Sequence, residues 1–332
     1  MTECLVDAYD AALFDLDGVI YLGPVAVEGA VGAMASLEAH GKRVMYVTNN
    51  AARSSQTVVD HLRQLGFTAA ESTVLTSAQV AAVGIARVLP PGSAVLVAGS
   101  ASLVDLIREV GLTPVSSADA DPVAVVQGYD PQLTWPMLDE VCLAIQRGAT
   151  WFATNDDASR PTDRGIVPGL GAMLAVVSTA IGGAPAAIFG KPFRPMLAEA
   201  VQRTGAQHPI FVGDRIDTDI IGANRAAMDS LLVFSGAHGK FDLLAAGPGE
   251  RPTHIGADIA ALLLPPRRLL PIATGVACGG QRVELHGREA VIVSQPITLQ
   301  EQLDALWALA ALAWGDPALE TDGALADLDL LP

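Results

Sequence analysis

The sequence of 332 residues is long enough for about two domains of typical size, which excludes a single small module. Twenty Lys and Arg residues stand against 36 Asp and Glu residues, and the resulting net charge of -16 repels a nucleic-acid backbone. Because hydrophobic residues make up 51% of the chain and charged residues 17%, the composition predicts a folded protein rather than a disordered one.

The cysteines and the N-terminal region indicate a reducing compartment. Cys4, Cys142 and Cys278 are far apart and have neither metal-ligand nor disulfide-framework spacing. The acidic N-terminal region lacks the basic start and apolar stretch of a secretory signal. Residues 166–190 are uncharged and long enough to span a membrane, but prolines and glycines predict a loop, a short buried helix, a turn and a strand there instead. We therefore expect a cytoplasmic protein with no membrane or nucleic-acid partner.

Short apolar runs alternate with helical patterns along the chain. Residues 11–14 and 43–48 predict the first two strands, and a helix is expected from an N-cap at Ser55 through Leu65. With helical patterns between most of them, further strands are expected at 94–98, 123–127, 186–189, 210–213, 231–234 and 253–256. This alternation predicts an α/β fold with parallel sheets covered by helices.

A pair of aspartates follows the first predicted strand. Asp15 and Asp17 are two residues apart, so in extended chain their side chains point the same way, and parallel sheets bind ligands just beyond the ends of their strands. The pair suits Mg²⁺, which takes oxygen ligands, and covalent phosphoryl transfer, in which one aspartate attacks and the other serves as acid and base. A solvated Asp-Gly turn is the alternative.

Polar residues also follow two later strands. Thr48 and Asn49 offer a hydroxyl and an amide that can hydrogen-bond phosphoryl oxygens, with simple turn or capping residues as the alternative. Lys191 follows the strand at 186–189 and precedes a helix expected to begin near Pro195. Its ammonium can neutralise charge on a phosphoryl group, with a solvated lysine as the alternative.

Three acids lie where a strand meets a helix, at Asp214, Asp217 and Asp219. A helix N-terminus stabilises a carboxylate by a few tenths to about 1 kcal/mol, which explains Asp217 or Asp219 but not all three. A cation shared with Asp15 and Asp17 explains the surplus better, with Asp214 as a direct ligand and Asp219 acting indirectly.

Together and in this order, these elements resemble the haloacid dehalogenase superfamily of phosphatases. The resemblance implies that Asp15 is the nucleophile and that Asp17 is the acid/base and a metal ligand through its backbone carbonyl. It also implies that Lys191 is both catalytic and substrate-binding. It assigns phosphate binding to one set of residues and Mg²⁺ binding to another. The phosphate-binding set is Gly18, Thr48, Asn49, Asn50 and Lys191, and the metal set is Asp15, Asp17, Asp214 and Asp219.

The 140 residues between Asn50 and Lys191 are more than a crossover helix requires and imply an inserted domain. This is where the family has a C2 cap, and the runs at 126–130, 153–157 and 168–171 resemble the class IIA branch of phosphoglycolate, glycerol 3-phosphate and p-nitrophenyl phosphatases. Asn155 and Asp157 of the cap are the expected substrate contacts. The resemblance implies a Rossmann-like parallel-sheet core at 1–77 and 187–263, an α/β cap at 78–186 and a small α+β appendage at 264–332.

The appendage lies outside the resemblance. Residues 265–268 and Pro271 predict a linker, and residues 276–293 predict two or three short strands. Thr298 with Glu301 forms a capping box for an apolar helix reaching Trp314. A segment that only covers core surface and one with a regulatory or interaction role are both open. We expect the chemistry not to need residues after about 264.

These observations predict a Mg²⁺-dependent phosphomonoester hydrolase that acts through an aspartyl-phosphate on a small phosphorylated metabolite. By resemblance the substrate is glycerol 3-phosphate or 2-phosphoglycolate. The alternative enzyme is a nucleotide or pyridoxal phosphate phosphatase, and the alternative of another class is a non-catalytic sensor of a phosphorylated ligand. A homodimer formed through the cap is a further expectation.

Overall fold

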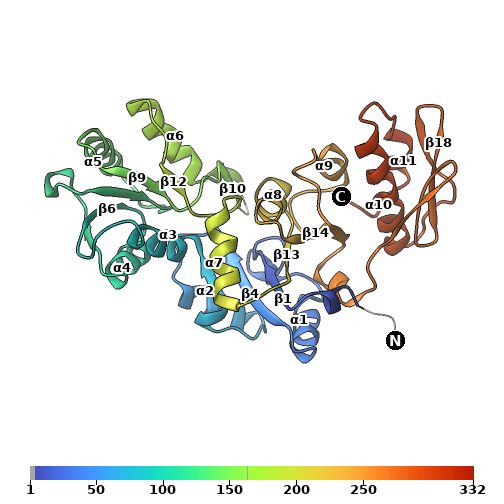
Figure 1. Ribbon diagram of the computed structural model, residues 1–332, viewed down its shortest axis with the longest axis horizontal. Coiled ribbons are helices and arrows are strands. Elements are labelled where there is room, and N and C mark those ends of the chain that lie inside the picture. Colours follow the sequence, from blue (N-terminus) through green and yellow to red (C-terminus); the bar gives the residue numbers. More distant parts are fainter. Residues whose placement is uncertain (1–3, 163) are drawn as a thin grey trace. The chain divides into compact units, whose positions relative to one another are not determined.

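The computed structural model describes residues 4–162 and 164–332, which form two compact units (Figure 1). The first unit combines Met1–Val44 with Thr204–Pro332, and the second spans Met45–Arg203. The expected domain boundaries at 77/78 and 186/187 fall inside the second unit, and the boundary at 263/264 falls inside the first. All three boundaries stay predictions.

A parallel sheet with the strand order β15-β14-β13-β1 forms the centre of the first unit. Its strands are β1 (Ala11–Phe14), β13 (Pro209–Gly213), β14 (Asp229–Val233) and β15 (His254–Gly256). All four side chains of β1 are buried, as expected of a strand covered on both faces, and this explains its continuous apolar run. The strands expected at 11–14, 210–213, 231–234 and 253–256 are confirmed, with ends shifted by at most two residues.

Short elements connect these strands. They are η1 (Leu5–Ala8), the hairpin β2 (Tyr21–Leu22) and β3 (Val25–Ala26), α1 (Ala30–Ala39), the π-helical turn η4 (Ile216–Ile220), α8 (Ile221–Arg225), α9 (Lys240–Ala245) and η5 (Ile259–Leu263). Strand β4 (Arg43–Thr48) begins in the first unit and continues into the second.

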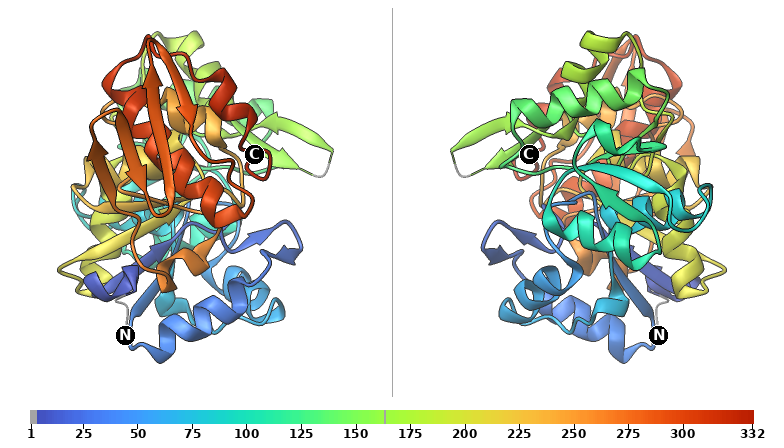
Figure 2. Two further views of the ribbon diagram at one scale, coloured as in Figure 1. Left: turned by 90° about the vertical axis from the view of Figure 1, so that its right-hand side faces the viewer. Right: turned by 90° about the vertical axis from the view of Figure 1, so that its left-hand side faces the viewer.

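The residues beyond 264 form an antiparallel sheet beside a long helix, as Figure 2 shows. The sheet has the order β16 (Leu269–Ile272), β17 (Gly275–Cys278), β18 (Gln281–His286) and β19 (Glu289–Ile292), and the helices are α10 (Leu299–Gly315) and α11 (Asp322–Ala326). The expected capping box is confirmed, because the Thr298 hydroxyl accepts from the Glu301 N–H and the Glu301 carboxylate accepts from the Thr298 N–H. The expected linker was partly wrong, since Pro271 lies in edge strand β16, where a missing N–H is tolerated.

One apolar cluster joins α10 to the parallel sheet. Leu303, Leu306 and Leu309 of α10 are fully buried and pack in the same cluster as Leu232 of β14 and Ile255 of β15. The apolar face that the sequence predicts for this helix is therefore covered within the first unit.

The second unit contains the parallel pair β4–β5 and a five-stranded parallel sheet of order β12-β9-β8-β6-β7. The strands are β5 (Val74–Thr76), β6 (Ala94–Ala98), β7 (Thr113–Val115), β8 (Ala124–Gln127), β9 (Thr150–Ala153) and β12 (Ala187–Ile188), with the hairpin β10 (Ser159–Thr162) and β11 (Gly165–Pro168). The helices are α2 (Ser55–Gln64), η2 (Glu71–Thr73), α3 (Ser77–Ala86), α4 (Ala101–Glu109), η3 (Ala118–Ala120), α5 (Trp135–Gln146), α6 (Leu170–Ile181) and α7 (Arg194–Thr204). The expected α/β class is confirmed.

Two local predictions in this unit need correction. The N-cap of α2 is Ser54, whose hydroxyl accepts from the Thr57 N–H at 3.2 Å, and not Ser55. Either serine can cap a helix, so residue type did not fix the register. The uncharged stretch 166–190 contains the helix and strand that were expected, α6 and β12, but residues 166–168 belong to β11 rather than to a loop. Among the described residues, the structure has no helix with both the length and the apolar character that crossing a bilayer requires.

The apolar cluster around α10 predicts a stability effect. Leu306→Ala removes a fully buried side chain and should lower the free energy of unfolding by about 2–5 kcal/mol in urea titrations. Ile297, just before the helix, is 81% exposed, so Ile297→Ala should change it by less than about 0.5 kcal/mol. Equal effects of the two changes would contradict the packing described for the cluster.

Candidate active site

Three carboxylates lie together beyond the ends of two neighbouring strands. Asp15 follows β1, Asp214 follows β13, and Asp219 lies in η4. One carboxylate oxygen from each residue lies within 4.8 Å of the other two, and all three side chains are buried. The structure thus brings together three of the four residues that the sequence predicts as a metal set.

The charges of this cluster favour a cation. Two carboxylates 4.8 Å apart repel each other by roughly 3 kcal/mol at an effective dielectric constant of about 20. A divalent cation between them converts this repulsion into attraction, and a set made only of oxygen donors suits a hard cation such as Mg²⁺. The donor set therefore fits the predicted metal.

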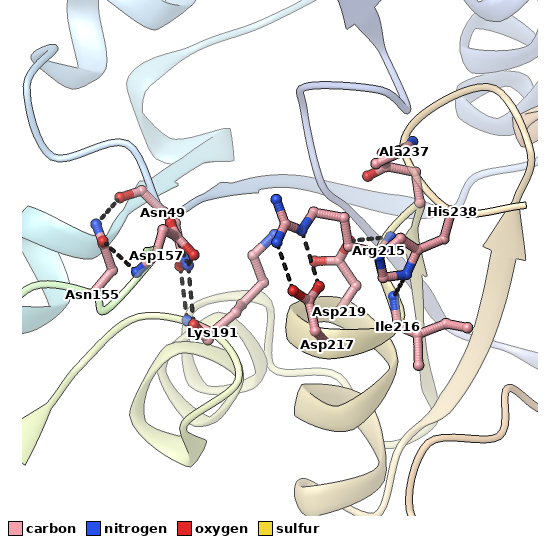
Figure 3. A network of polar contacts seen from close by, with 11 residues as sticks. Asn49, Asn155, Asp157, Lys191, Arg215, Ile216, Asp217, Asp219, Ala237 and His238 are labelled. Carbon is pink, nitrogen blue, oxygen red and sulfur yellow. Dashed lines mark hydrogen bonds and ion pairs between the residues drawn. The ribbon is translucent and has the colours of Figure 1, made fainter. Parts of the chain in front are cut away.

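Backbone N–H groups orient two of the carboxylates. Arg215, Asp219 and Ala237 are labelled in the right-hand part of Figure 3. Ala237 N–H donates to Oδ2 of Asp214 at 2.7 Å, and Arg215 N–H donates to Oδ2 of Asp219 at 3.1 Å. These neutral donors fix the direction of each carboxylate without cancelling its charge.

Gly18 allows the aspartate pair to approach Asp214. Its φ of +88° lies in the left-handed region, and a Cβ at this position would come 2.2 Å from Oδ2 of Asp214. Asp17, which precedes it, is exposed, and its carboxylate is not part of the cluster. The side chain of Asp17 is therefore accessible to a bound molecule, as an acid/base requires.

Asp217 has a different role from its neighbours. Its carboxylate forms an ion pair with Arg215, with Nε–Oδ1 and Nη2–Oδ2 distances of 3.0 and 2.6 Å (Figure 3). Burial alone would raise the pKa of Asp217, but the hydrogen bonds and charge of Arg215 hold that pKa below its ordinary value. The sequence left open whether Asp217 or Asp219 serves the helix. The structure places Asp219 in the cluster and pairs Asp217 with arginine.

In the second unit, the side chain of Asn49 holds the backbone of Lys191 (left-hand part of Figure 3). Its Oδ1 accepts from the Lys191 N–H at 2.8 Å, and its Nδ2 donates to the Lys191 carbonyl at 3.0 Å. Asn49 therefore fixes the main chain from which the Lys191 side chain extends. This gives its amide a positioning role beside the phosphate binding expected from the sequence.

The two expected substrate contacts of the cap also touch Asn49. Nδ2 of Asn155 donates to the Asn49 carbonyl at 2.6 Å, and Nδ2 of Asn49 donates to both carboxylate oxygens of Asp157 at 3.2 Å. Their contact with substrate stays a prediction, and the structure adds this connection to Asn49.

Thr48 and Asn50 form a tight polar turn next to Asn49. The Thr48 hydroxyl accepts from the Asn50 N–H at 3.1 Å, and Oδ1 of Asn50 accepts from the Ala52 N–H at 2.9 Å. The side-chain oxygen of Asn50 therefore has the turn-forming role that the sequence offers as the alternative to phosphate binding. The hydroxyl proton of Thr48 remains a donor for a ligand because the hydroxyl acts as an acceptor in this bond.

Sequence reasoning missed two contributors. The Ser77 hydroxyl donates to the Asn49 carbonyl at 2.7 Å, and the loop after β14 supplies the Ala237 N–H that orients Asp214. Ser77 comes directly after β5, which pairs with β4, so recognising that short strand would have pointed to it. A backbone N–H leaves no signal in residue type.

Comparison with known proteins defines the class. A family model described as haloacid dehalogenase-like hydrolase matches residues 12–113, and a second model, of hydrolase-like members of the same group, matches residues 188–262. The chain belongs to the haloacid dehalogenase-like hydrolases, and the resemblance predicted from its motifs is confirmed.

Individual relatives place the chain in the expected branch. D-glycerol 3-phosphate phosphatase of Mycobacterium tuberculosis is 43% identical over 260 residues, which is 78% of this chain and 72% of the relative. Acid sugar phosphatase of Staphylococcus aureus is 35% identical over 69% of this chain and 87% of its own.

Solved structures give the same result. Glycerol phosphate phosphatase from M. tuberculosis in complex with magnesium matches with a TM-score of 0.87 and 36% identity over 99% of this chain and 98% of its own. The match therefore includes the appendage. A p-nitrophenyl phosphatase from Archaeoglobus fulgidus matches with a TM-score of 0.71 and 25% identity over 77% of this chain and 98% of its own.

The contacts of Asn49 predict a kinetic effect. Asn49→Asp keeps the size of the side chain but removes the N–H donor to the Lys191 carbonyl and adds a charge beside Asp157. Losing a hydrogen bond worth about 1 kcal/mol, together with this repulsion, should lower kcat/KM for p-nitrophenyl phosphate by at least about tenfold.

Asn224→Asp is a matched control. Nδ2 of Asn224 also donates to backbone carbonyls, those of Gly249 and Arg251, but these lie in the first unit outside the carboxylate cluster. We expect this variant to keep its activity. Equal loss in both variants would argue against a specific role of Asn49.

Proposed function

We propose that the protein is a Mg²⁺-dependent phosphomonoester hydrolase whose substrate is glycerol 3-phosphate. The observation that carries the proposal is the cluster of buried carboxylates Asp15, Asp214 and Asp219 at the ends of β1 and β13. The names of the M. tuberculosis relatives, a glycerol 3-phosphate phosphatase and a structure holding magnesium, support the substrate and the metal.

Asp15 and Asp17 carry the covalent chemistry in this proposal. A carboxylate oxygen of Asp15 attacks phosphorus, the bond from phosphorus to the alcohol oxygen breaks, and Asp17 donates a proton to that oxygen. The deprotonated Asp17 then takes a proton from water, whose oxygen attacks phosphorus of the aspartyl-phosphate, and the bond from phosphorus to the Asp15 oxygen breaks. Inorganic phosphate leaves and both aspartates return to their starting states.

The other residues hold the groups that react. Asp15, Asp214 and the backbone carbonyl of Asp17 bind Mg²⁺, and Asp219 supports the site. Bound Mg²⁺ supplies positive charge to the phosphoryl oxygens. In the second unit, the Thr48 hydroxyl and the Lys191 ammonium bind phosphoryl oxygens.

The proposal takes a small alcohol as the leaving group and assigns the selection of the substrate to the cap. Nucleotides and pyridoxal phosphate are the alternatives within this enzyme class, and 2-phosphoglycolate is the alternative among small substrates. A cytoplasmic location and a homodimer formed through the cap complete the proposal. Light scattering of the purified protein tests the dimer.

Replacing the nucleophile should abolish turnover. Asp15→Asn cannot form the aspartyl-phosphate, and losing a catalytic nucleophile costs on the order of a million-fold in other enzymes. Release of p-nitrophenol in Mg²⁺ measures the loss. Chelation with EDTA should silence the wild-type enzyme, and added Mg²⁺ should restore it.

Asp217→Asn controls for the loss of an aspartate near the cluster. Asp217 pairs with Arg215 and its side chain is 52% exposed, so we expect activity close to wild type. Asp15→Asn protein with a tenth of wild-type activity would show that the nucleophile is wrongly assigned.

A substrate panel tests the identity of the leaving group. We expect kcat/KM, measured by phosphate release, to be higher for glycerol 3-phosphate than for 2-phosphoglycolate, sugar phosphates, nucleotides or pyridoxal phosphate. A nucleotide or pyridoxal phosphate at the top of the panel would overturn the substrate proposal but leave the phosphatase reaction intact. The same panel with Asp157→Ala tests the cap, because a substrate contact changes the ranking, whereas support of Asn49 alone lowers all rates equally.

A further inference from the structure

The last five residues of the sequence contact the loop that orients Asp214. We call Leu328–Pro332 the tail segment and Ser235–Lys240 the anchor loop. Both belong to the first unit, and neither carries a step of the proposed reaction. Their contacts nevertheless form a continuous path to the carboxylate cluster.

One end of the anchor loop packs directly against the cluster. Besides the bond from the Ala237 N–H to Oδ2 of Asp214, the His238 N–H donates to the Asp214 carbonyl at 3.2 Å. The Ser235 hydroxyl donates to the Gly18 carbonyl at 2.7 Å. This loop therefore supplies a donor that orients the Asp214 carboxylate.

The other end of the anchor loop is bound by the tail segment. Lys240 donates from its backbone N–H to the Pro332 carbonyl at 2.8 Å, and from Nζ to the carbonyls of Leu328 at 2.5 Å and Leu331 at 3.0 Å. The Lys240 side chain is buried, so these carbonyls replace water around its amino group. Next to it, a Cβ on Gly239 would come 2.4 Å from the Pro332 carbonyl oxygen.

The tail segment is itself fixed by the appendage. Gln302 of α10 accepts from the Leu330 N–H at 2.8 Å through Oε1 and donates to Oδ1 of Asp329 at 2.7 Å through Nε2. Leu328 and Leu331 are buried in the apolar cluster around α10. The tail segment is thus a fixed support for the loop rather than a loose end.

We propose that the tail segment is a positioning element of the metal site. It fixes Gly239 and Lys240, the anchor loop carries this constraint to Ala237, and the Ala237 N–H holds the Asp214 carboxylate in the direction that a metal ligand needs. The inference rests on the proposed Mg²⁺ site. Because Asp15 and Asp17 are untouched, the effect falls on Mg²⁺ affinity and not on kcat at saturating Mg²⁺.

Gly239→Ala tests this path without deleting any contact residue. The φ of Gly239 is -117°, which alanine adopts without strain, so the new Cβ acts only by displacing the Pro332 carbonyl. Partners that orient metal ligands change metal affinity by about 10–100-fold, and we expect the Mg²⁺ dissociation constant from calorimetry to rise about tenfold. The Mg²⁺ concentration for half-maximal hydrolysis of p-nitrophenyl phosphate should rise by the same factor, with kcat unchanged.

The chain offers matched controls. A Cβ on Gly249, also in the first unit, meets nothing within 4 Å, so Gly249→Ala should leave Mg²⁺ affinity unchanged. Lys240→Met, which removes the Nζ donor, is compared with Lys42→Met, because Nζ of Lys42 also donates to a backbone carbonyl, that of Tyr9 before β1. Lys240→Arg, which keeps a donor, should bind Mg²⁺ more tightly than Lys240→Met.

The outcomes separate this inference from the proposed function. If the wild-type protein binds no Mg²⁺, the proposed metal site is wrong and the inference falls with it. If the wild type binds Mg²⁺ and Gly239→Ala binds it equally well, the tail segment has no such role and the metal site stands. A loss of kcat without a change in Mg²⁺ affinity would also overturn the inference. Should Gly239→Ala fail to fold, the Mg²⁺ dissociation constants of Lys240→Met and Lys42→Met decide. A higher constant for Lys240→Met alone supports the inference, and equal constants overturn it.

Discussion

The repulsion among the buried carboxylates Asp15, Asp214 and Asp219 is the constraint on which the first unit depends. Taking a charge out of water costs several kcal/mol even in a relaxed protein, and like charges at short distance add to that cost. The strands that lead to these residues are apolar and buried, so the fold supplies rigidity. Backbone N–H donors and a bound cation both stabilise such a cluster, and the structure shows the first and suits the second.

Both units position charged groups with neutral amides. In the first unit, the backbone amides of Arg215 and Ala237 hold carboxylates, and in the second the side-chain amide of Asn49 holds the backbone of Lys191. A neutral donor fixes the geometry of its partner without cancelling the partner's charge. Asp217, by contrast, lies outside the cluster and forms an ion pair with Arg215.

The sequence predicted those features that depend on strand burial and on charge. Buried parallel strands are continuous apolar runs, so the aspartates and the lysine that interrupt them stand out, and Asp15, Asp214 and Asp219 were expected to share a site. The contacts of Asn49 with Asn155, Asp157 and Lys191 could not be predicted, because these residues lie 106 to 142 residues away in the chain and are brought near only by folding. The anchor loop escaped prediction for another reason, since it contacts Asp214 through main-chain N–H groups, which every residue except proline carries.

The appendage shows why reaction chemistry and stability need not share a boundary. All the residues with a proposed chemical role precede position 220, yet Leu232 and Ile255 of the parallel sheet lie in one apolar cluster with Leu306 of α10. Without the appendage those side chains would meet water, at roughly 1.5–3 kcal/mol for each one exposed. The sheet that carries Asp15 and Asp214 is therefore completed by residues that follow the last catalytic motif. Burial of this kind is non-directional and fixes no carboxylate by itself, so any influence of the appendage on the cluster must pass through directional contacts, and the hydrogen bonds of Gln302 and Lys240 are of that kind.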